Sequence, residues 1–400
     1  MEGMSHGRRR RRLLLLAPAL IAALAFVAAG CGGSEESTGN TSASTDTAGG
    51  NAEGSIWVLL PDSASSPRWE SDDRRFFDQA FSDAGVEHTI VNAENDASRQ
   101  QQQAEQAIAS GAKVILLVSL DTGSGATIID NAKDAGVDVI EYDRFNTGGS
   151  GGAAYVSFDN VAVGATMAEI VEPEIEALGV DKPRVVELNG GEEDNNSFLF
   201  KSGYDETVQK HVDDGSWELV ADQFTPGWDN QEAQRIMEQI ITNADNDVNA
   251  VFAANDGLAN SAINALEAAG LDTTKIPISG QDATAAGIQN ILLGKQTMTV
   301  YKPIEAEADV AANVAIALLN GDDISGVQSD FDFELIGIKA EDGKPTESST
   351  GDGVVPYFAL KPIGVTADNI LDTVIADKFR TLTEICTGDT AASDFCKENS

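Results

Sequence analysis

The feature of this sequence that most constrains its fold is a regular alternation of short apolar segments with amphipathic ones, which begins at Ser55. Four apolar segments rich in valine, isoleucine and leucine come first, at 55–61, 88–94, 113–119 and 137–143. Near-continuous apolar runs of this length are typical of strands that are buried on both faces of a sheet. Because strands that alternate with helices assemble into parallel sheets, the pattern predicts an α/β fold with doubly wound parallel sheets.

The amphipathic segments have the periodicity and the stop signals of helices. In the segment 72–85, Phe76, Phe77 and Phe81 fall on one helical face, so we expect them to form core contacts rather than to bind a ligand. Glycine follows several of these segments, and only glycine adopts the left-handed conformation of a helix C-terminus without a Cβ clash. The glycines concerned are Gly85, Gly111, Gly136 and Gly270.

The alternation pauses at 145–160 and then resumes, which indicates a second unit of the same kind. Five further apolar segments follow, at 184–190, 217–224, 248–255, 276–282 and 297–303. A chain of 400 residues is longer than one hydrophobic core usually fills, and a hydrophobic content of 42% is ample for two. We therefore expect two α/β lobes.

Residues 1–30 have the pattern of an export signal and are not expected to belong to the fold. A run of arginines precedes an apolar segment that extends to Ala29, and small residues lead to Cys31. A membrane-spanning helix is the alternative, but the apolar segment is at the short limit for a span and no basic residues follow it. Because the segment ends at a cysteine, it resembles the signal of a bacterial lipoprotein, in which Cys31 would be lipidated; a plain secretory signal remains open. Residues 31–54, rich in glycine, serine and threonine, are expected to form a flexible tether.

The charge balance and the scarcity of cysteine and histidine exclude several classes of function. The formal net charge is −39, with 65 acidic and 26 basic residues, so we expect no binding to nucleic acid phosphates. Cys386 and Cys396 are expected to pair as a disulfide in an oxidising compartment, although two free thiols in the tail remain the alternative. Without a cysteine or histidine cluster, we expect no metal site and no cofactor.

Polar and aromatic residues gather at the positions that follow the expected strands. In open parallel sheets, ligands bind outside the carboxyl ends of the strands, so such residues from both lobes would meet at one site. The residues are Arg68, Trp69, Asp143, Arg144, Asp194, Asn196, Trp228, Asn255, Asp256, Asp282 and Lys302. One shared site explains their common placement better than a series of separate coincidences does.

Ordinary structural roles would explain several of these residues one at a time. Asp256 and Asp282 could be N-caps, because aspartate is favoured where a helix begins. Asp143 and Arg144 could form a surface ion pair, and the two tryptophans could pack between the lobes. Lys302, which precedes a proline, could simply be solvated.

The set of side chains matches the chemistry of a sugar. Indole rings stack on the apolar faces of a pyranose, and carboxylates, amides and guanidinium groups bridge neighbouring hydroxyls. Paired carboxylates also occur in glycosidases, but Asp194, Asp256 and Asp282 are better explained as hydroxyl acceptors, and nothing marks one as an acid of raised pKa. The sequence contains no complete G-x-G-x-x-G motif and no Walker A loop, and "EEDNN" lacks the calcium-loop pattern. We therefore expect a binding protein and not an enzyme.

Several motifs carry a resemblance to a known family. They are "PRW", "YDR", "YVSFDN", "EDNN", "GW", "AAND", "SGQDATAAGIQNILLGKQTMTVYKP" and "DTVIAD". In order and spacing they are similar to those of bacterial xylose-binding proteins, the substrate-binding components of sugar ABC transporters in the type I periplasmic-binding superfamily. The resemblance covers about 55–376 and assigns sugar binding to the strand-end positions named above. It implies two Rossmann-like lobes joined by three crossings, near 155–162, 300–303 and 322–330, that close over one sugar.

The resemblance also implies how the chain is divided and with what it interacts. The first lobe would contain 55–158 and 303–322, the second 159–302 and 323–376, and 377–400 would form a tail. The protein would be a monomer on the outer face of the cell membrane that captures a monosaccharide, D-xylose first of all, and delivers it to an ABC transporter permease. It would contact the membrane only through the lipid anchor. A related protein for another aldose such as glucose or ribose, or for a signalling sugar that it reports to a membrane sensor, remains the alternative.

Overall fold

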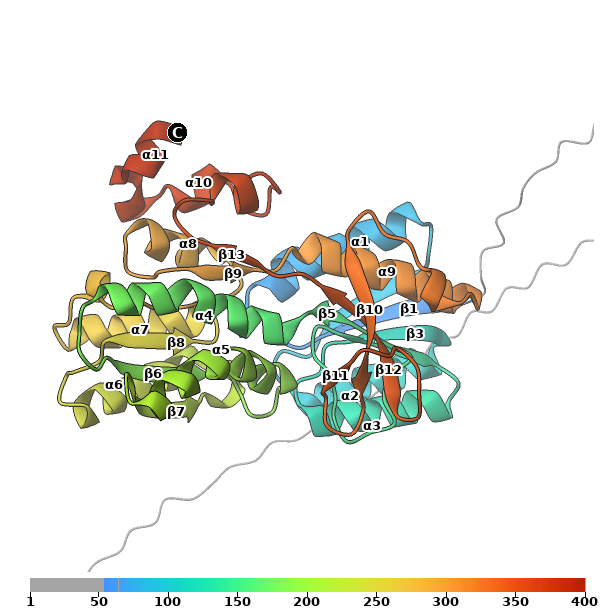
Figure 1. Ribbon diagram of the computed structural model, residues 1–400. Coiled ribbons are helices and arrows are strands. Elements are labelled where there is room, and N and C mark those ends of the chain that lie inside the picture. The colour runs from blue at the N-terminus through green and yellow to red at the C-terminus, as the bar shows by residue number, and fades with distance from the viewer. Residues whose placement is uncertain (1–53, 64, 400) are drawn as a thin grey trace, which may run out of the picture. The chain divides into compact units, whose positions relative to one another are not determined.

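The computed structural model describes residues 54–63 and 65–399 (Figure 1). The expected signal peptide, the expected lipidation site at Cys31 and all of the expected tether except Gly54 lie outside these residues. Within the described ranges, no helix combines the length and the apolar character that crossing a membrane requires.

The first lobe is built on an eight-stranded sheet with the strand order β11-β10-β12-β5-β4-β3-β1-β2. Side chains of β1 (Ser55–Leu60) alternate between the two faces of the sheet, because successive residues of a strand point in opposite directions. Ile56 and Val58 pack with one layer of helices, whereas Trp57 and Leu59 pack with the other. This confirms the α/β fold with helices on both faces. The parallel strands are β1 (Ser55–Leu60), β2 (His88–Asn92), β3 (Ala112–Leu117), β4 (Asp138–Tyr142) and β5 (Ala154–Phe158).

The helices of the first lobe form two layers. The layer that contacts Ile56 contains η1 (Trp69–Asp73), α1 (Arg74–Asp83) and α9 (Ile304–Asn320). The opposite layer contains α2 (Ala97–Ala109) and α3 (Thr122–Asp134). Phe77 and Phe81 of α1 are fully buried in the first layer, as the helical periodicity predicts.

The expectation that the whole of 323–376 belongs to the second lobe is wrong for the part that ends at Leu360. After η4 (Ile324–Gly326), the chain forms β10 (Phe333–Lys339), β11 (Pro345–Thr346) and β12 (Val354–Leu360). Strand β12 pairs in parallel with β5, and β10 pairs antiparallel with β12, so all three extend the first sheet. The physical reason is that β12 is apolar and adds to the open edge of β5, where its side chains join a core cluster with those of the first lobe.

The chain therefore crosses between the lobes at three places, one of which differs from the expectation. The first crossing joins β5 to α4, and the second joins β9 to α9, within or next to the expected ranges. The third lies at 360–363, between β12 and β13, and not at 322–330.

The second lobe has a three-stranded parallel sheet, β7-β6-β8, continued by single bridges from Val251 to Ile278 and from Gln281 to Val300. Strand β9 then pairs antiparallel with β13. The strands are β6 (Arg184–Asn189), β7 (Glu218–Phe224), β8 (Ala250–Ala253), β9 (Thr299–Tyr301) and β13 (Ile363–Val365). The helical segments are α4 (Asn160–Ala177), α5 (Asn195–Asp214), η2 (Pro226–Trp228), α6 (Asn230–Asn243), α7 (Asp256–Ala268), η3 (Thr273–Lys275) and α8 (Ala285–Leu292).

Two glycines allow α4 and α5 to approach closely. A Cβ atom at Gly164 would overlap the carbonyl oxygen of Phe200, and one at Gly203 would overlap that of Val161. Glycine at both positions therefore sets the packing of α5, which begins at the polar cluster that follows β6.

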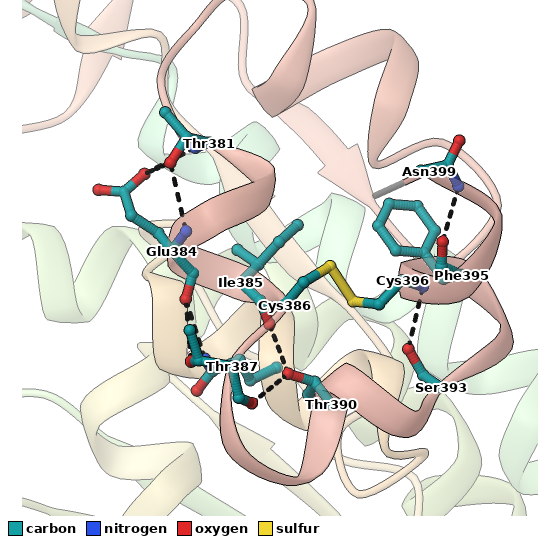
Figure 2. The surroundings of a disulfide bond; sticks show 11 residues. Thr381, Glu384, Ile385, Cys386, Thr387, Thr390, Ser393, Phe395, Cys396 and Asn399 are labelled. Carbon is teal, nitrogen blue, oxygen red and sulfur yellow. Dashed lines mark hydrogen bonds between the residues drawn. A yellow bond between two sulfur atoms is a disulfide. The ribbon is translucent and has the colours of Figure 1, made fainter.

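The C-terminal tail packs against α8 of the second lobe, and its end is closed by a disulfide (Figure 2). Cys386 and Cys396 are bonded with their Cα atoms 5.5 Å apart, so the prediction of a disulfide is confirmed. Gln289 of α8 donates to the carbonyl oxygen of Glu384 and to Thr387 in the tail. Segment η5 (Leu371–Ile375) precedes the tail, whose own helical segments are α10 (Leu382–Ile385), η6 (Gly388–Ala392) and α11 (Asp394–Asn399).

Candidate functional site

A cavity of about 30 Å³ lies where residues that follow strands of both lobes meet. Ten of the eleven residues predicted from the sequence line it: Arg68, Trp69, Asp143, Arg144, Asp194, Asn196, Trp228, Asn255, Asp282 and Lys302. The carboxyl ends of parallel strands meet at one edge of each sheet, which explains why residues so distant in the sequence lie together. Four lining residues were not predicted: Ser65, Ser66, Phe200 and Gln281.

The missed residues lie within or beside segments that the sequence had already marked. Ser65 and Ser66 precede the "PRW" motif, and Gln281 is the middle residue of "GQD". Phe200 lies outside the motifs, but it is an aromatic residue near the start of the helix that follows "EEDNN", a position that a ligand could reach. Ser65, Ser66 and Phe200 could have been identified by extending the neighbouring motif by about four residues.

Arg68 is the most extensively paired cation of the cavity wall. Its Nε and Nη2 donate to the two carboxylate oxygens of Asp73, at 2.9 and 2.8 Å. Its Nη1 donates to Asp143 at 2.8 Å, and Nη2 also donates to Glu307 of α9 at 2.7 Å. The guanidinium carbon lies 4.3 Å from the centre of the Trp69 ring, a cation–π contact. These contacts hold the first-lobe side of the cavity in one arrangement.

Asp143 connects the two cations of this wall. Its backbone has a left-handed φ of 59°, and its Oδ2 accepts from Arg68 at 2.8 Å and from Lys302 at 3.1 Å. Burial alone would raise the pKa of this carboxyl, but the charges of Lys302, Arg68 and Arg144 hold it well below its ordinary value. Asp143 is therefore ionised at every pH at which the protein would work, and it serves as an acceptor.

The opening of α5 supplies the second-lobe side. Asp194 is the N-cap of α5, since its Oδ1 accepts from the backbone N–H of Asn196 at 2.9 Å. Its Oδ2 also lies 3.1 Å from Nε of Arg144 in the first lobe. Asn196 donates from Nδ2 to the backbone oxygen of Asp143 at 2.9 Å. The residues of "EEDNN" thus act both as a helix cap and as contacts between the lobes.

Two buried tryptophans form walls of the cavity. Trp69 and Trp228 are 3% and 6% exposed, and the indole Nε1 of each has no hydrogen-bond partner among the described residues. Trp228 fits because a Cβ at Gly190 would overlap its ring, and the edge of Phe200 packs against it with ring centroids 6.4 Å apart. An unpaired buried N–H costs free energy, so a ligand oxygen that accepted a hydrogen bond from either indole would recover that cost.

Asp256 does not line the cavity, although its neighbour Asn255 does. The Oδ2 of Asp256 accepts from the backbone N–H of Thr284 at 2.8 Å, and its Oδ1 accepts from Gln296 at 2.8 Å. Burial raises the pKa of Asp256 to about 7, against these hydrogen bonds. The N-cap of α7 is Asn255, whose Oδ1 accepts from the N–H of Leu258. Asp256 therefore has a structural role within the second lobe and not the contact expected from the sequence.

Asp282 lies in a turn that closes the cavity between the lobes. It has φ of 91° and its Oδ2 accepts from the hydroxyl of Ser66 in the first lobe at 3.2 Å. Thr284, not Asp282, is the N-cap of α8, so the expectation that Asp282 could be a cap is not met. The Oε1 atom of the adjacent Gln281 is buried and has no donor among the described residues.

The charges that line the cavity balance. Three cations, Arg68, Arg144 and Lys302, face three carboxylates, Asp143, Asp194 and Asp282. A ligand with a net charge would leave one buried charge without compensation, which is costly in a buried site. The arrangement therefore favours a neutral ligand with several hydroxyl groups and an apolar face.

A possible metal-binding group lies away from this cavity. Among the described residues, Glu172, Glu176 and His211 are the one set of three ligand atoms within 4.8 Å of each other. Both ring nitrogens of His211 have protein partners, Ser216 at 2.7 Å and Glu172 at 2.6 Å, and the ring stacks on Trp217. These contacts account for the group as a polar contact between α4 and α5.

Comparisons with known proteins agree with this architecture. The model of the periplasmic binding protein domain matches residues 57–323. The D-xylose-binding periplasmic protein of Escherichia coli (strain K12) is 34% identical over 318 residues, which cover 80% of this chain and 88% of that protein. The protein of the same name from Haemophilus influenzae is 35% identical and covers 78% and 87%. A solute-binding protein of an ABC transporter from Clostridium phytofermentans, solved with bound β-D-glucose, superposes with a TM-score of 0.71 at 27% identity and covers 82% of this chain and 99% of that one.

Proposed function

Because this chain belongs to the periplasmic binding protein family, we propose that it is an exported binding protein that captures one monosaccharide between its lobes and delivers it to an ABC transporter permease. The observation that carries the proposal is the composition of the cavity wall. Two buried indole rings, balanced charges and residues of both lobes meet there, and three buried polar atoms of the wall have no hydrogen-bond partner in the part of the chain that the structure describes. A sugar offers hydroxyls for those atoms and C–H faces for the rings.

The proposed mechanism is closure of the lobes about the three crossings. Side chains of the two lobes contact each other across the cavity, as in the pairs of Arg144 with Asp194 and of Asn196 with Asp143. Separation of the lobes would break these contacts and admit the sugar. Closure would then replace part of them by hydrogen bonds to sugar hydroxyls, with Trp69 and Trp228 against the ring. The closed arrangement would be the form that the permease recognises.

We propose D-xylose as the first ligand to test. The two relatives with that sugar in their names are 34% and 35% identical to this chain, and they support a pentose. The structure with bound β-D-glucose is 27% identical and supports a second candidate, another aldose such as glucose or ribose. A signalling sugar that the protein reports to a membrane sensor is the remaining alternative. In each case the same wall residues would bind the ring.

We further propose that the protein acts outside the cell membrane as a monomer. The pattern that ends at Cys31 supports lipidation of that residue, and 31–54 would then hold the lobes near the outer membrane face. Contact with the membrane would be through this anchor alone. Metabolic labelling with a fatty acid should mark the wild-type protein and not Cys31→Ser.

Calorimetric titration of the protein with D-xylose, D-glucose and D-ribose tests the proposal. Thermal melts give a second measurement. A sugar present at 100 times its dissociation constant stabilises the folded state by about 2.7 kcal/mol, so the melting temperature should rise measurably. Trp228→Ala should abolish the heat of binding while the far-UV circular dichroism spectrum stays native. Trp217→Ala is the matched control, because Trp217 is equally buried but stacks on His211 away from the cavity. No heat with any of the three sugars, or equal affinity in Trp228→Ala, would refute the proposal.

A further inference from the structure

Arg380, in the tail, contacts both lobes behind the cavity. Its Nε donates to the backbone oxygen of Ala283 in the second lobe at 3.0 Å. Its Nη1 lies 3.6 Å from Oδ2 of Asp72 in η1 of the first lobe. The side chains of Arg380 and Asp72 are 10% and 6% exposed, so this ion pair is shielded from solvent.

The second-lobe contact holds the turn that carries a cavity residue. Asp282 and Ala283 have φ angles of 91° and 44°, a left-handed conformation that is unfavourable for residues with a side chain. The turn is therefore kept by its surroundings. Val300 and Thr299 bind its N–H groups, and Arg380 binds its last carbonyl oxygen. Without Arg380, the carbonyl oxygen of Ala283 would lose its hydrogen bond, and the turn that carries Asp282 would be held less firmly.

The first-lobe contact falls on the segment that carries two other cavity residues. Asp72 lies three positions after Trp69 in the same single turn of π-helix that follows Arg68. Asp72 also accepts from the hydroxyl of Ser71 at 2.9 Å and lies 3.3 Å from Nη2 of Arg75, whose side chain is 58% exposed. Ser71 and Arg75 belong to the same part of the first lobe as Asp72, whereas Arg380 belongs to the tail.

The tail holds Arg380 in place through contacts on both sides of it. Its backbone N–H donates to Val374, and its guanidinium group stacks on Phe379, which itself packs against Tyr301 next to Lys302. Immediately after it, Thr381 and Glu384 form a capping box that begins α10, as Figure 2 shows. The side chain is thus supported by a packed element and not by a loose end of the chain.

We infer that Arg380 is a positioning residue that fastens the Asp282 turn to the helical turn of Arg68 and Trp69 when the lobes are together, and so slows the release of the bound sugar. The inference rests on the proposed function. It assigns to the tail a part in the lifetime of the complex, in addition to its packing on α8. A purely structural role in the second lobe would need the contact to Ala283 but not the one to Asp72.

A double-mutant cycle with Arg380→Gln and Asp72→Asn separates these two roles. The readouts are the association and dissociation rates of D-xylose and of D-glucose, measured by stopped-flow tryptophan fluorescence. Each single variant should raise the dissociation rate roughly threefold to thirtyfold and change the association rate by less than about twofold, and the double variant should be no faster than Arg380→Gln. Arg235→Gln is the matched control, since Arg235 is an exposed arginine on α6 whose one ion-pair partner among the described residues is its helix neighbour Glu232.

A second readout does not depend on any sugar. Dyes attached to cysteines introduced at the exposed residues Thr127 and Gln231, one in each lobe, report the separation of the lobes by single-molecule energy transfer. In free protein, Arg380→Gln and Asp72→Asn should both shift the distribution toward wider separation, again without adding. If the wild type binds no sugar, the proposed function fails and this readout decides the inference alone. Wild-type dissociation rates and wild-type distance distributions in both variants would overturn it.

Discussion

Glu307 offers a direct test of how the buried charges around the cavity are balanced. Its Oε2 accepts from Arg68 at 2.7 Å, its Oε1 has no partner among the described residues, and the residue is fully buried. Arg68 and Lys302 supply two positive charges, whereas Asp73, Asp143 and Glu307 would supply three negative ones. Burial raises the pKa of Glu307 to about 8, despite the opposing charge of Arg68. Protonation of this one carboxyl therefore neutralises the cluster at neutral pH.

The expected effect on stability follows from the difference between the folded and unfolded pKa. Between the ordinary value of 4.5 and about 8, the folded protein keeps a proton on Glu307 that the unfolded chain has lost. The free energy of unfolding therefore falls as pH rises through this window, by about 1.4 kcal/mol per pH unit from this group, or about 4 to 5 kcal/mol in all. Glutamine at 307 is neutral at every pH and removes this contribution. Glu307→Gln should match the wild type at pH 4.5 and exceed its stability increasingly up to pH 8.

Urea denaturation at half-unit intervals from pH 4.5 to 9 measures the difference. Subtracting the wild-type curve isolates Glu307, since Glu141 and Asp256, whose pKa values burial raises to about 7, titrate in both proteins. Glu305→Gln is the control for the substitution itself, because Glu305 lies on the same helix but is exposed. Parallel curves for the wild type and Glu307→Gln would refute the assignment of the proton to Glu307.

Two further predictions concern the cavity and the tail. Asp143→Asn should lower the free energy of unfolding by about 3 kcal/mol at pH 7, because it removes the carboxylate that pairs with the buried Lys302, and thermal melts against the exposed-site control Asp330→Asn would reveal this. An unchanged melting temperature would contradict the role of Asp143 as the carboxylate that balances Lys302. Cys386→Ser should cost about 3 kcal/mol by opening the disulfide loop, yet leave sugar affinity unchanged, since Arg380 precedes the loop. Two reactive thiols at Cys386 and Cys396 in the native wild type would contradict the bond itself.

The predictions from the sequence were accurate where the chemistry follows the end of a strand. Strands buried on both faces are recognisable as continuous apolar runs, and their carboxyl ends lie together by topology alone. For this reason residues as distant as Arg68 and Lys302 could be placed at one cavity without knowledge of any distance. The rule predicts which residues are near a site, but it does not predict where each side chain points.

Asp256 shows this limit at the scale of one residue. It follows Asn255 directly, and both come after β8. Asn255 caps α7 and lines the cavity, whereas the next side chain is rotated by the first helical turn toward Thr284 and Gln296. The direction depends on which of two adjacent residues becomes the cap, and asparagine and aspartate are nearly equal as caps.

The misplaced segment 333–360 shows the limit at the scale of a lobe. Strand β10 is partly exposed and antiparallel, so its pattern differs from that of the buried parallel strands that signalled the rest of the fold. It pairs with the nearby β12, but the pairing of β12 with β5 joins residues about 200 positions apart. The sequence of such a strand does not predict which sheet it joins.

The carboxylates behind the cavity were beyond prediction for a related reason. A guanidinium group bonds sugar hydroxyls well only if its direction is already fixed, since ordering it upon binding would cost affinity. Arg68 is fixed by Asp73, five residues away, and by Glu307, separated from it by 239 residues. Glu307 lies on a helix that re-enters the first lobe after the second crossing, so folding of the whole two-lobed chain must precede formation of the site. A sequence motif that ends at "PRW" cannot contain this support, and a first lobe without α9 would lack it.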